Sequence, residues 1–159
     1  MCRITVFTPT YNRAYALPHL YETLQAQTFR DFEWLIVDDG SSDNTEELIQ
    51  GWINDARLPI RYIKTPNGGK HRAINKGLAL AKGELFFIVD SDDWLPTDSL
   101  YWIDLYYSQI CSCEEFAGVA GSKCYPNGTK VGGDVTYDVL DTDNVSYREV
   151  HKIKGDMAE

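Results

Sequence analysis

The chain has 159 residues and a formal net charge of −9, because 24 Asp and Glu outnumber 15 Lys and Arg. This length suits one domain, or a large part of one, whose core needs no disulfide or metal. The acidity argues against a general nucleic-acid binder, which needs a basic stripe. The longest strongly apolar run, residues 85–89, is too short to cross a bilayer.

Cysteine usage and the amino terminus bear on the compartment. Cys2, Cys111, Cys113 and Cys124 form no C-x-x-C pair, and no histidine lies at a metal-ligand spacing from them. The amino terminus lacks a basic segment followed by a long apolar stretch, so no signal peptide is visible. The sequence therefore indicates reduced cysteines in a cytoplasmic protein.

The first predicted strand covers residues 4–8, a short run that is mostly apolar, β-branched or aromatic. This composition is typical of a strand that is buried on both faces of a parallel sheet. A helix is predicted next, since apolar residues then recur at i, i+3, i+4 and i+7. They are Leu17, Leu20, Tyr21 and Leu24.

The second predicted strand covers residues 34–37, and the second helix is predicted to begin at a capping box. Asp43 and Glu46 have the spacing at which each side chain accepts the backbone N–H of the other residue. The apolar face of this helix comprises Leu48, Ile49, Trp52 and Ile53.

The third and fourth predicted strands cover residues 60–63 and 85–89, and each precedes a helix. The helix between them is predicted to end at Gly83, a residue type that favours helix ends. Its apolar face comprises Ala73, Ile74, Gly77, Leu78 and Ala81. The last helix begins near Thr97 and is predicted to bury Leu100, Ile103, Tyr107 and Ile110.

The alternation of strand and helix predicts an α/β fold with a parallel sheet covered by helices on both faces. The pattern changes after about residue 115. Residues 116–125 resemble another strand, and a turn is predicted at Pro126-Asn127-Gly128. We therefore expect two parts, residues 1–115 and residues 116–159, of which the second is incomplete.

Every predicted strand is followed by a polar cluster. The clusters cover residues 8–13, 38–43, 64–70 and 90–93. Because ligands of a parallel sheet bind at the carboxyl ends of its strands, this edge is the predicted site. Two clusters are acidic, and carboxylates this close repel one another unless a cation lies among them.

Asp90 and Asp92 follow a buried strand and can present oxygens to a hard divalent ion such as Mg²⁺ or Mn²⁺. In isolation such an acidic run is more often a solvated turn with helix caps, but its place after the fourth strand favours the ion. Asp39 suits either a turn or a hydrogen bond to a ligand hydroxyl or base edge, whereas Asp43 is assigned to capping. Tyr11 can stack on a planar ring, and is explained equally well as a half-buried aromatic.

Four motifs, in this order and at βαβ spacing, resemble family 2 glycosyltransferases of the GT-A fold. They are the Pro-Thr-Tyr-Asn-Arg of residues 9–13, the Asp-Asp-Gly-Ser-Ser-Asp of residues 38–43, the Asn-Gly-Gly of residues 67–69 and the Asp-Ser-Asp-Asp of residues 90–93. The match covers residues 1–110. It implies a mostly parallel, Rossmann-like sheet, a nucleotide-sugar donor that is most often a UDP-sugar, and transfer with inversion at the anomeric carbon.

The resemblance also implies roles for residues that match its motifs. Pro9, Tyr11 and Asp39 would hold the nucleoside, with Asp39 bonding the base. Asp92 would be the principal ligand of a Mn²⁺ or Mg²⁺ ion, and Asp90 would approach the ribose or the metal. The other implied donor-binding residues are Arg13, Asn67, Lys70 and Ser91.

This sequence departs from the family pattern in two places. Ile74 stands where members commonly have Arg before the Asn that corresponds to Asn75, so Lys70 or Arg72 is expected to supply a cation to the phosphates. The family's catalytic base is an acidic residue of an acceptor-binding half, which is expected beyond Glu159. Residues 116–159 would be the truncated start of that half, and this chain would then bind donor without turning it over.

The resemblance implies a saccharide or lipid-linked saccharide acceptor, no nucleic-acid partner, and synthesis of cell-surface polysaccharide. Peripheral association with the inner face of the membrane is a further implication, although no basic amphipathic helix supports it.

Other proteins gather acidic residues at a sheet edge. A receiver-like signalling domain has its acidic pair after the first strand, and a phosphatase has its Asp-x-Asp there, where this chain has Thr-Pro-Thr. A nucleotidyltransferase would show a Gly-rich loop with Arg at that place, and a dinucleotide oxidoreductase would show G-x-G-x-x-G. A non-catalytic nucleotide-binding or metal-binding module stays open as an alternative.

Overall fold

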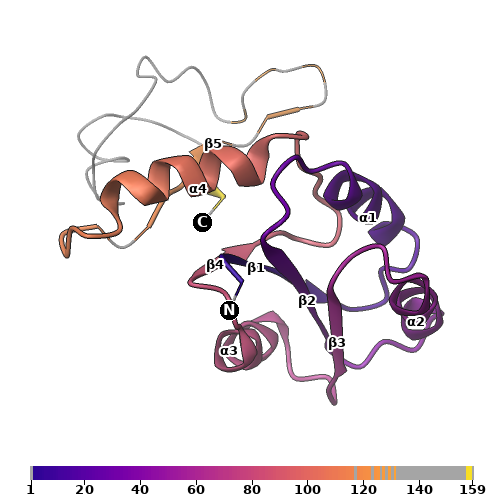
Figure 1. Ribbon diagram of the computed structural model, residues 1–159. Helices are drawn as coiled ribbons and strands as arrows, with labels where there is room; N and C mark the ends of the chain where they lie inside the picture. Colours follow the sequence, from indigo (N-terminus) through magenta and orange to yellow (C-terminus); the bar gives the residue numbers. More distant parts are fainter. Residues whose placement is uncertain are drawn as a thin grey trace. The chain divides into compact units, whose positions relative to one another are not determined.

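The computed structural model describes residues 2–116, 118–122, 124, 125, 127, 129, 131, 157 and 158 (Figure 1). The chain divides into two compact units, residues 1–119 and 120–159. The first unit contains β1 (Ile4–Thr10), α1 (Leu17–Gln25), β2 (Phe32–Asp38), α2 (Thr45–Asp55), β3 (Ile60–Lys64), α3 (Lys70–Leu80), β4 (Leu85–Ile88) and α4 (Ser99–Ile110). The second contains β5 (Gly121–Ser122) and β6 (Met157–Ala158).

The first unit is built on a four-stranded sheet in which every strand is parallel to its neighbours. The strand order is β3-β2-β1-β4, so β1 lies between β2 and β4. Val6 of β1 is opposite Trp34 of β2 and Phe87 of β4. The four strands predicted for residues 1–115 are all present, and the predicted parallel α/β fold is confirmed.

β1 is longer than predicted, because it continues through Pro9 to Thr10. A proline has no N–H to donate, which normally excludes it from central strands. The Phe7 carbonyl accepts the Val89 N–H at 2.9 Å, so the backbone groups of Phe7, and of Pro9 two residues later, turn toward β4. The described pairing of β1 with β4 ends at Phe7 and Ile88. No β4 residue therefore lies opposite Pro9, and the missing proline N–H costs the sheet no hydrogen bond there.

One face of the sheet is covered by α1 and α2, as Figure 1 shows. Tyr21 of α1, Trp34 of β2 and Trp52 of α2 form a stack there, in which the Tyr21 and Trp52 rings lie 4.3 Å apart at 3°. The Trp34 indole N–H donates to the Thr8 hydroxyl at 3.0 Å, so the buried ring has no unpaired donor. Tyr21 and Trp52 belong to the helix faces predicted from periodicity.

The other face is covered by α3, which packs on a cluster of Phe7, Leu35, Val37 and Ala73. Gly77 lets the helix approach closely, because a Cβ there would lie 2.6 Å from Cδ2 of Phe7. The prediction that Leu78 belongs to the buried face was wrong, since this residue is 54% exposed. A glycine at the contact brings the backbone nearer to the sheet and leaves a narrower buried stripe than the apolar pattern predicts.

Two helix-end predictions were also wrong. Asp43 does accept the Thr45 N–H at 3.1 Å, but Asn44 is the N-cap and the reciprocal half of the capping box is missing. Glu46 pairs instead with Lys64 of β3 at 2.8 Å. α3 ends at Leu80 with Ala81 as its C-cap.

Gly83 therefore does not cap the helix. It allows the segment just before β4 to lie against the backbone of β1. A Cβ on Gly83 would meet the Thr5 nitrogen and would lie 2.6 Å from the Ile4 carbonyl carbon.

A buried polar network ties the amino-terminal end of the sheet. Glu33 of β2 accepts the Thr5 hydroxyl and the Lys82 N–H, both at 2.8 Å, and pairs with Arg61 of β3 at 2.9 Å. Burial acts to raise the pKa of Glu33, but the bonds from Arg61, Thr5 and Lys82 outweigh it and hold the pKa below its ordinary value. The carboxylate is ionised and fully paired at neutral pH.

Helix α4 contacts residues just before β1 and just after α1. Its Asp104 pairs with Arg3 at 2.6 Å, and the Leu100 N–H donates to the side-chain oxygen of Gln27 at 3.1 Å. It begins at Ser99, two residues after the predicted start, and Leu100 is its fully buried residue. No helix in the described part of the chain is long and apolar enough to cross a membrane.

In the second unit β5 and β6 pair antiparallel, with Gly121 opposite Ala158. The predicted strand over residues 116–125 is described in part, and Gly121–Ser122 are the described residues of it that pair as a strand. Of the predicted turn, Pro126 and Gly128 lie outside the described residues. The Tyr125 N–H donates to the Thr129 carbonyl at 2.8 Å.

Candidate functional site

The four polar clusters meet at the carboxyl-terminal edge of the sheet because all four strands run in one direction. Backbone bonds hold the segments that follow neighbouring strands together. The Asp39 N–H donates to the Thr10 carbonyl at 2.9 Å, and the Thr65 N–H donates to the Asp38 carbonyl at 2.8 Å. Pro9, at the end of β1, and Ser91, after β4, are both buried.

Asn12 joins the loop after β1 to the loop after β2. Its backbone has a positive φ of 51°, a conformation that Asn adopts more readily than most residues. Its side-chain oxygen accepts the Ser42 N–H at 2.8 Å, and its own N–H donates to the Ser41 hydroxyl at 2.8 Å. Sequence reasoning did not single out this residue, although an Asn after a Pro-containing strand end was a local signal for such a turn.

Asp38 is a structural carboxylate. It is fully buried, and it accepts the Ser41 N–H at 2.7 Å and the Tyr62 hydroxyl at 2.5 Å. Burial, followed by this bond to Asp38, raises the pKa of Tyr62 well above its ordinary value. With these partners Asp38 holds the start of the loop in place.

Asp39 organises the loop that precedes α3. Its two carboxylate oxygens accept the Gly68 and Gly69 N–H groups at 2.8 and 2.7 Å. Gly40 allows the contact, because it has a φ of 84° and a Cβ there would lie 2.9 Å from the Asn67 nitrogen. The side chain of Asn67 is exposed beside this contact. Asp39 is 6% exposed, and each of its oxygens keeps a lone pair that could accept a further hydrogen bond.

Two of the acidic residues after β4, Asp90 and Asp92, form ion pairs. The Lys70 ammonium lies 2.7 and 2.8 Å from the two carboxylate oxygens of Asp90. Arg13 lies 3.2 Å from Asp92 and donates to the Tyr15 hydroxyl at 2.5 Å. The structure thus brings four predicted site residues, Arg13, Lys70, Asp90 and Asp92, into two contacts that link three loops.

The remaining predicted site residue, Tyr11, is half exposed at the end of β1. Next to it the Thr10 hydroxyl is buried and has no hydrogen-bond partner among the described residues. A buried hydroxyl without a partner is uncommon in native proteins, and a bound water, ion or ligand is one explanation; the buried Tyr21 hydroxyl shares this property. Sequence reasoning missed Thr10, because threonine in a strand is ordinarily unremarkable.

The first turn of α3 is electropositive. Its residues are Lys70, His71 and Arg72, it has no acidic residue, and the N-cap Gly69 contributes no side-chain bond. The partial positive charge of a helix amino terminus favours anions and disfavours cations. This helix start is therefore suited to an anionic group such as a phosphate.

Asp90 and Asp92 fit a divalent ion by their chemistry. Carboxylate oxygens are the ligands that Mg²⁺ and Mn²⁺ prefer, and one or two of them suffice where substrate phosphates complete the shell. Among the described residues, no group of three or more His, Cys, Asp or Glu is arranged to hold a metal. An ion held by these two carboxylates would complete its shell with water or with oxygens of a bound ligand.

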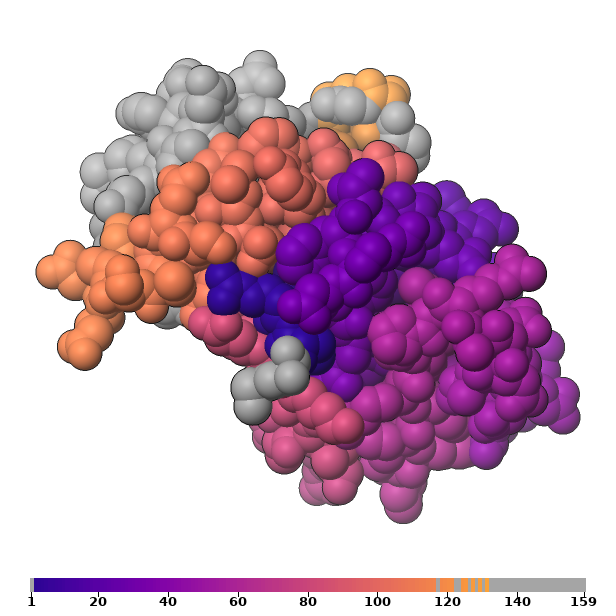
Figure 2. Space-filling model, in the orientation of Figure 1, coloured from indigo at the N-terminus to yellow at the C-terminus, as the bar shows by residue number. Residues whose placement is uncertain are grey.

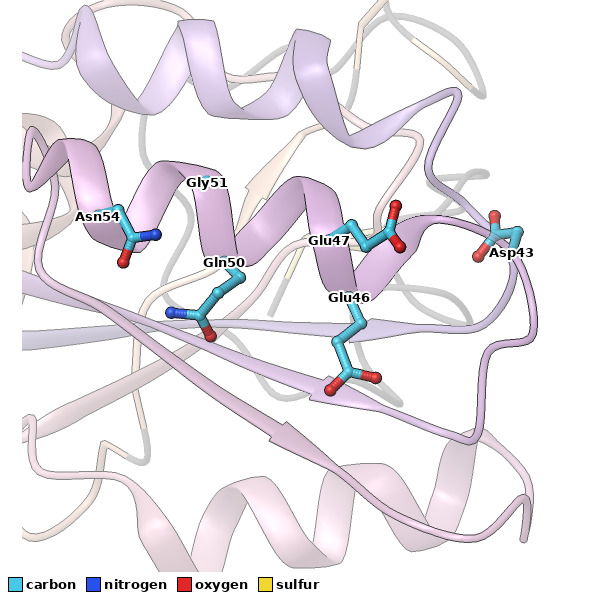
Figure 3. Close-up of a pocket in the computed structure, with 6 residues that line it drawn as sticks. All are labelled: Asp43, Glu46, Glu47, Gln50, Gly51 and Asn54. Carbon is cyan, nitrogen blue, oxygen red and sulfur yellow. The ribbon is translucent and has the colours of Figure 1, made fainter.

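A depression of about 610 Å³ lies away from these ion pairs, on α2 and the loop before it. Asp43, Glu46, Glu47, Gln50, Gly51 and Asn54 line it (Figure 3). Figure 3 shows Glu46, Glu47, Gln50 and Asn54 spread along the helix, and α2 also lies at the surface in the space-filling view (Figure 2). Of its carboxylates, Asp43 accepts the Thr45 and Ala14 N–H groups, and Glu46 pairs with Lys64.

The chain was compared with known proteins. A family model described as "Glycosyl transferase family 2" matches residues 5–102. The poly(ribitol-phosphate) beta-N-acetylglucosaminyltransferase TarS of Staphylococcus aureus is 32% identical over 116 residues, which cover 69% of this chain and 20% of TarS.

Solved structures share the fold. The structure of S. aureus TarS 1–349 in complex with UDP-GlcNAc matches with a TM-score of 0.63 and 30% identity, over 67% of this chain and 31% of that one. A mannosyltransferase from Pyrobaculum calidifontis, in complex with GDP-Man and Mn²⁺, matches with a TM-score of 0.56 and 32% identity, over 60% of this chain and 29% of that one. The chain thus spans a third or less of the length of these relatives.

Proposed function

The chain belongs to glycosyltransferase family 2, and we propose that it binds the nucleotide-sugar donor of a sugar transfer to an acceptor hydroxyl. Its fold is the parallel α/β sheet of the GT-A type. One observation carries the proposal: three features lie at the same edge of the sheet. They are the loop before α3 that Asp39 bonds, the electropositive start of α3, and the two carboxylates of Asp90 and Asp92. The signalling, phosphatase and dinucleotide alternatives lack this support.

The donor is proposed to be a UDP-sugar. Pro9, Tyr11 and Asp39 would hold the nucleoside, and Asn67 and Ser91 would line its path. Arg13 and Lys70 would bond the diphosphate, since charge-assisted bonds to phosphate are about twice as strong as neutral ones. The structural relative with bound UDP-GlcNAc supports the nucleotide class, and the buried Thr10 hydroxyl supports a ligand contact at the end of β1.

Asp90 and Asp92 are proposed to hold a Mn²⁺ or Mg²⁺ ion. When bound, such an ion neutralises charge that develops on the departing diphosphate. The Mn²⁺ in the mannosyltransferase structure supports this choice.

For the transfer, we propose inversion at the anomeric carbon. The acceptor oxygen forms a bond to that carbon while the bond to the diphosphate oxygen breaks, and the leaving group takes the electron pair. The proton of the acceptor hydroxyl passes to a carboxylate base. We assign the donor site to residues 1–115, and we assign the base to an acceptor-binding half that residues 116–159 begin.

The acceptor is proposed to be a saccharide or lipid-linked saccharide, and the setting cell-surface polysaccharide synthesis at the cytoplasmic face of the membrane. The name of the relative TarS, which acts on a poly(ribitol-phosphate), supports a polymeric acceptor.

Asp92→Asn is expected to weaken binding of UDP in the presence of Mn²⁺ by roughly 100-fold, because the cation that bridges carboxylate and diphosphate loses a ligand. Calorimetric titration of the full chain with UDP, with Mn²⁺ and then with EDTA, measures this. Titrations with GDP and ADP test whether the site distinguishes the nucleobase of the donor. Asp98→Asn removes an exposed carboxylate that bonds Trp102 in α4 and is the matched control. Absence of UDP binding to the wild-type chain in both buffers would refute the proposed function.

A further inference from the structure

The ion pairs at the strand ends occupy the same carboxylate oxygens that a divalent cation would need. The Lys70 ammonium contacts both oxygens of Asp90, at 2.7 and 2.8 Å. Arg13 contacts one oxygen of Asp92, at 3.2 Å. A cation that binds these oxygens competes with the basic side chains for them, and most directly with Lys70, which contacts both oxygens of Asp90.

Both pairs are exposed enough to exchange readily. The side chains of Lys70 and Asp90 are 57% and 32% exposed, and those of Arg13 and Asp92 are 39% and 53% exposed. Exposed ion pairs of this kind contribute little to stability, because water and salt screen them. Arg13 has a second partner in Tyr15, whereas Asp90 is the partner found for the Lys70 ammonium in the described structure.

The start of α3 offers Lys70 a different partner. Lys70, His71 and Arg72 stand at the positive end of the helix, where cations are unfavourable and an anion is favourable. A phosphate bound there would contact the helix start and lie within reach of the lysine, which has four methylene groups between its backbone and its ammonium. The lysine can therefore turn from Asp90 to a phosphate without any change in the helix.

We propose that Lys70 is an exchangeable counter-ion, which covers Asp90 before ligands bind and passes to the donor diphosphate when a divalent cation takes its place. This inference rests on the proposed donor site. Asp90, Asp92, Lys70 and Arg13 together are neutral, and they remain so when a divalent cation and a diphosphate with one charge on each phosphate arrive together. The cation alone leaves the group positive and the diphosphate alone leaves it negative, so the two bind cooperatively.

Removing the Lys70 charge is expected to have opposite effects on the two ligands. Lys70→Met leaves Asp90 uncovered, so Mn²⁺ without nucleotide should bind about threefold to fivefold more tightly, the factor expected for an exposed ion pair. UDP-GlcNAc at saturating Mn²⁺ should bind roughly tenfold more weakly, because a charge-assisted bond to phosphate is lost. The electron paramagnetic resonance signal of free Mn²⁺ measures the first affinity, and calorimetry measures the second.

Lys82→Met is the matched control, since it makes the same charge change on an exposed side chain at the opposite end of the sheet, and both affinities should stay unchanged. Lys70→Gln should repeat the result of Lys70→Met. Weaker, unchanged or undetectable Mn²⁺ binding by both Lys70 variants overturns the exchange. If the wild-type chain binds UDP-GlcNAc with Mn²⁺ and the Lys70 variants behave like it, only this inference fails, whereas the proposed function fails if the wild-type chain binds no donor.

Discussion

Gly83→Ala is expected to lower the free energy of unfolding of the first unit by about 3 kcal/mol, the upper part of the range for overpacking. The new Cβ would meet the Thr5 nitrogen, and it would lie 2.6 Å from the Ile4 carbonyl carbon and 2.9 Å from the Leu85 carbonyl oxygen. These atoms are backbone atoms of β1 and β4, so no rotamer change relieves the overlap. Urea denaturation followed by tryptophan fluorescence measures the loss.

Gly51→Ala is the control with the opposite sign. Gly51 lies inside α2, and no described atom beyond its own helix backbone lies within 4 Å of the position that a Cβ would take, so the added methyl group meets open space. Alanine in place of glycine inside a helix stabilises it by about 0.5–1 kcal/mol. Equal midpoints of denaturation for the two variants would show that the approach of residue 83 to β1 is looser than described.

Glu33→Ala is expected to cost about 3 kcal/mol at pH 7. The carboxylate is 7% exposed, and its loss leaves the Thr5 hydroxyl without an acceptor. The Lys82 N–H keeps only a longer bond of 3.2 Å to the Thr5 hydroxyl oxygen, and Arg61 keeps the Leu80 carbonyl but loses its counter-charge. Breaking a buried pair typically costs about 3–5 kcal/mol, and the lower part of that range applies here because Arg61 is 30% exposed and can turn to water. The free energy of unfolding in urea checks this value.

The same variant has a characteristic pH dependence. Because the folded pKa of Glu33 lies below its ordinary value of 4.5, its ionised form stabilises the fold above that pH. The stabilisation is lost as the pH falls through the folded pKa, so the difference between wild type and Glu33→Ala should shrink below about pH 4.5. Glu46→Ala, which breaks the exposed pair with Lys64, should cost less than about 1 kcal/mol. A difference that stays constant into acid would contradict the assignment of the ionised pair.

The sheet could be predicted from the sequence because its strands are buried on both faces and therefore read as short apolar runs. Helix periodicity likewise identified Leu17, Leu20 and Leu24, which are fully buried. Boundaries were less predictable. Pro9 argues against a strand by its own chemistry, and only the early end of β4, a property of a neighbouring segment, makes it tolerable.

Contacts between distant residues account for the other errors. Leu78 fits the apolar pattern, but the closeness of Gly77 to Phe7 narrows the buried stripe. Glu46 has the spacing of a capping box, yet Lys64, which lies 18 residues later, competes successfully for its carboxylate. Neither competitor is visible in the local sequence, because each is brought near only by the fold.

The location of the candidate site was predictable, and its internal contacts were not. Strand direction alone places Asp39, Asp90 and Asp92 at one edge. Nothing in the sequence indicates that Asp39 would accept the Gly68 and Gly69 N–H groups, or that Asp38 would pair with Tyr62. These partners lie 24 to 30 residues apart in the chain, so their distances depend on sheet register and loop shape.

The network around Glu33 lies where β1 and β2 begin, and the carboxylates of the candidate site lie where the strands end. The two ends of one sheet thus have separate tasks, and a substitution at one end need not disturb the other. Divergence in this chain can therefore proceed along two independent routes. Changes near Glu33 alter the fraction of molecules that are folded, whereas changes near Asp90 would act on the proposed donor site of a folded molecule.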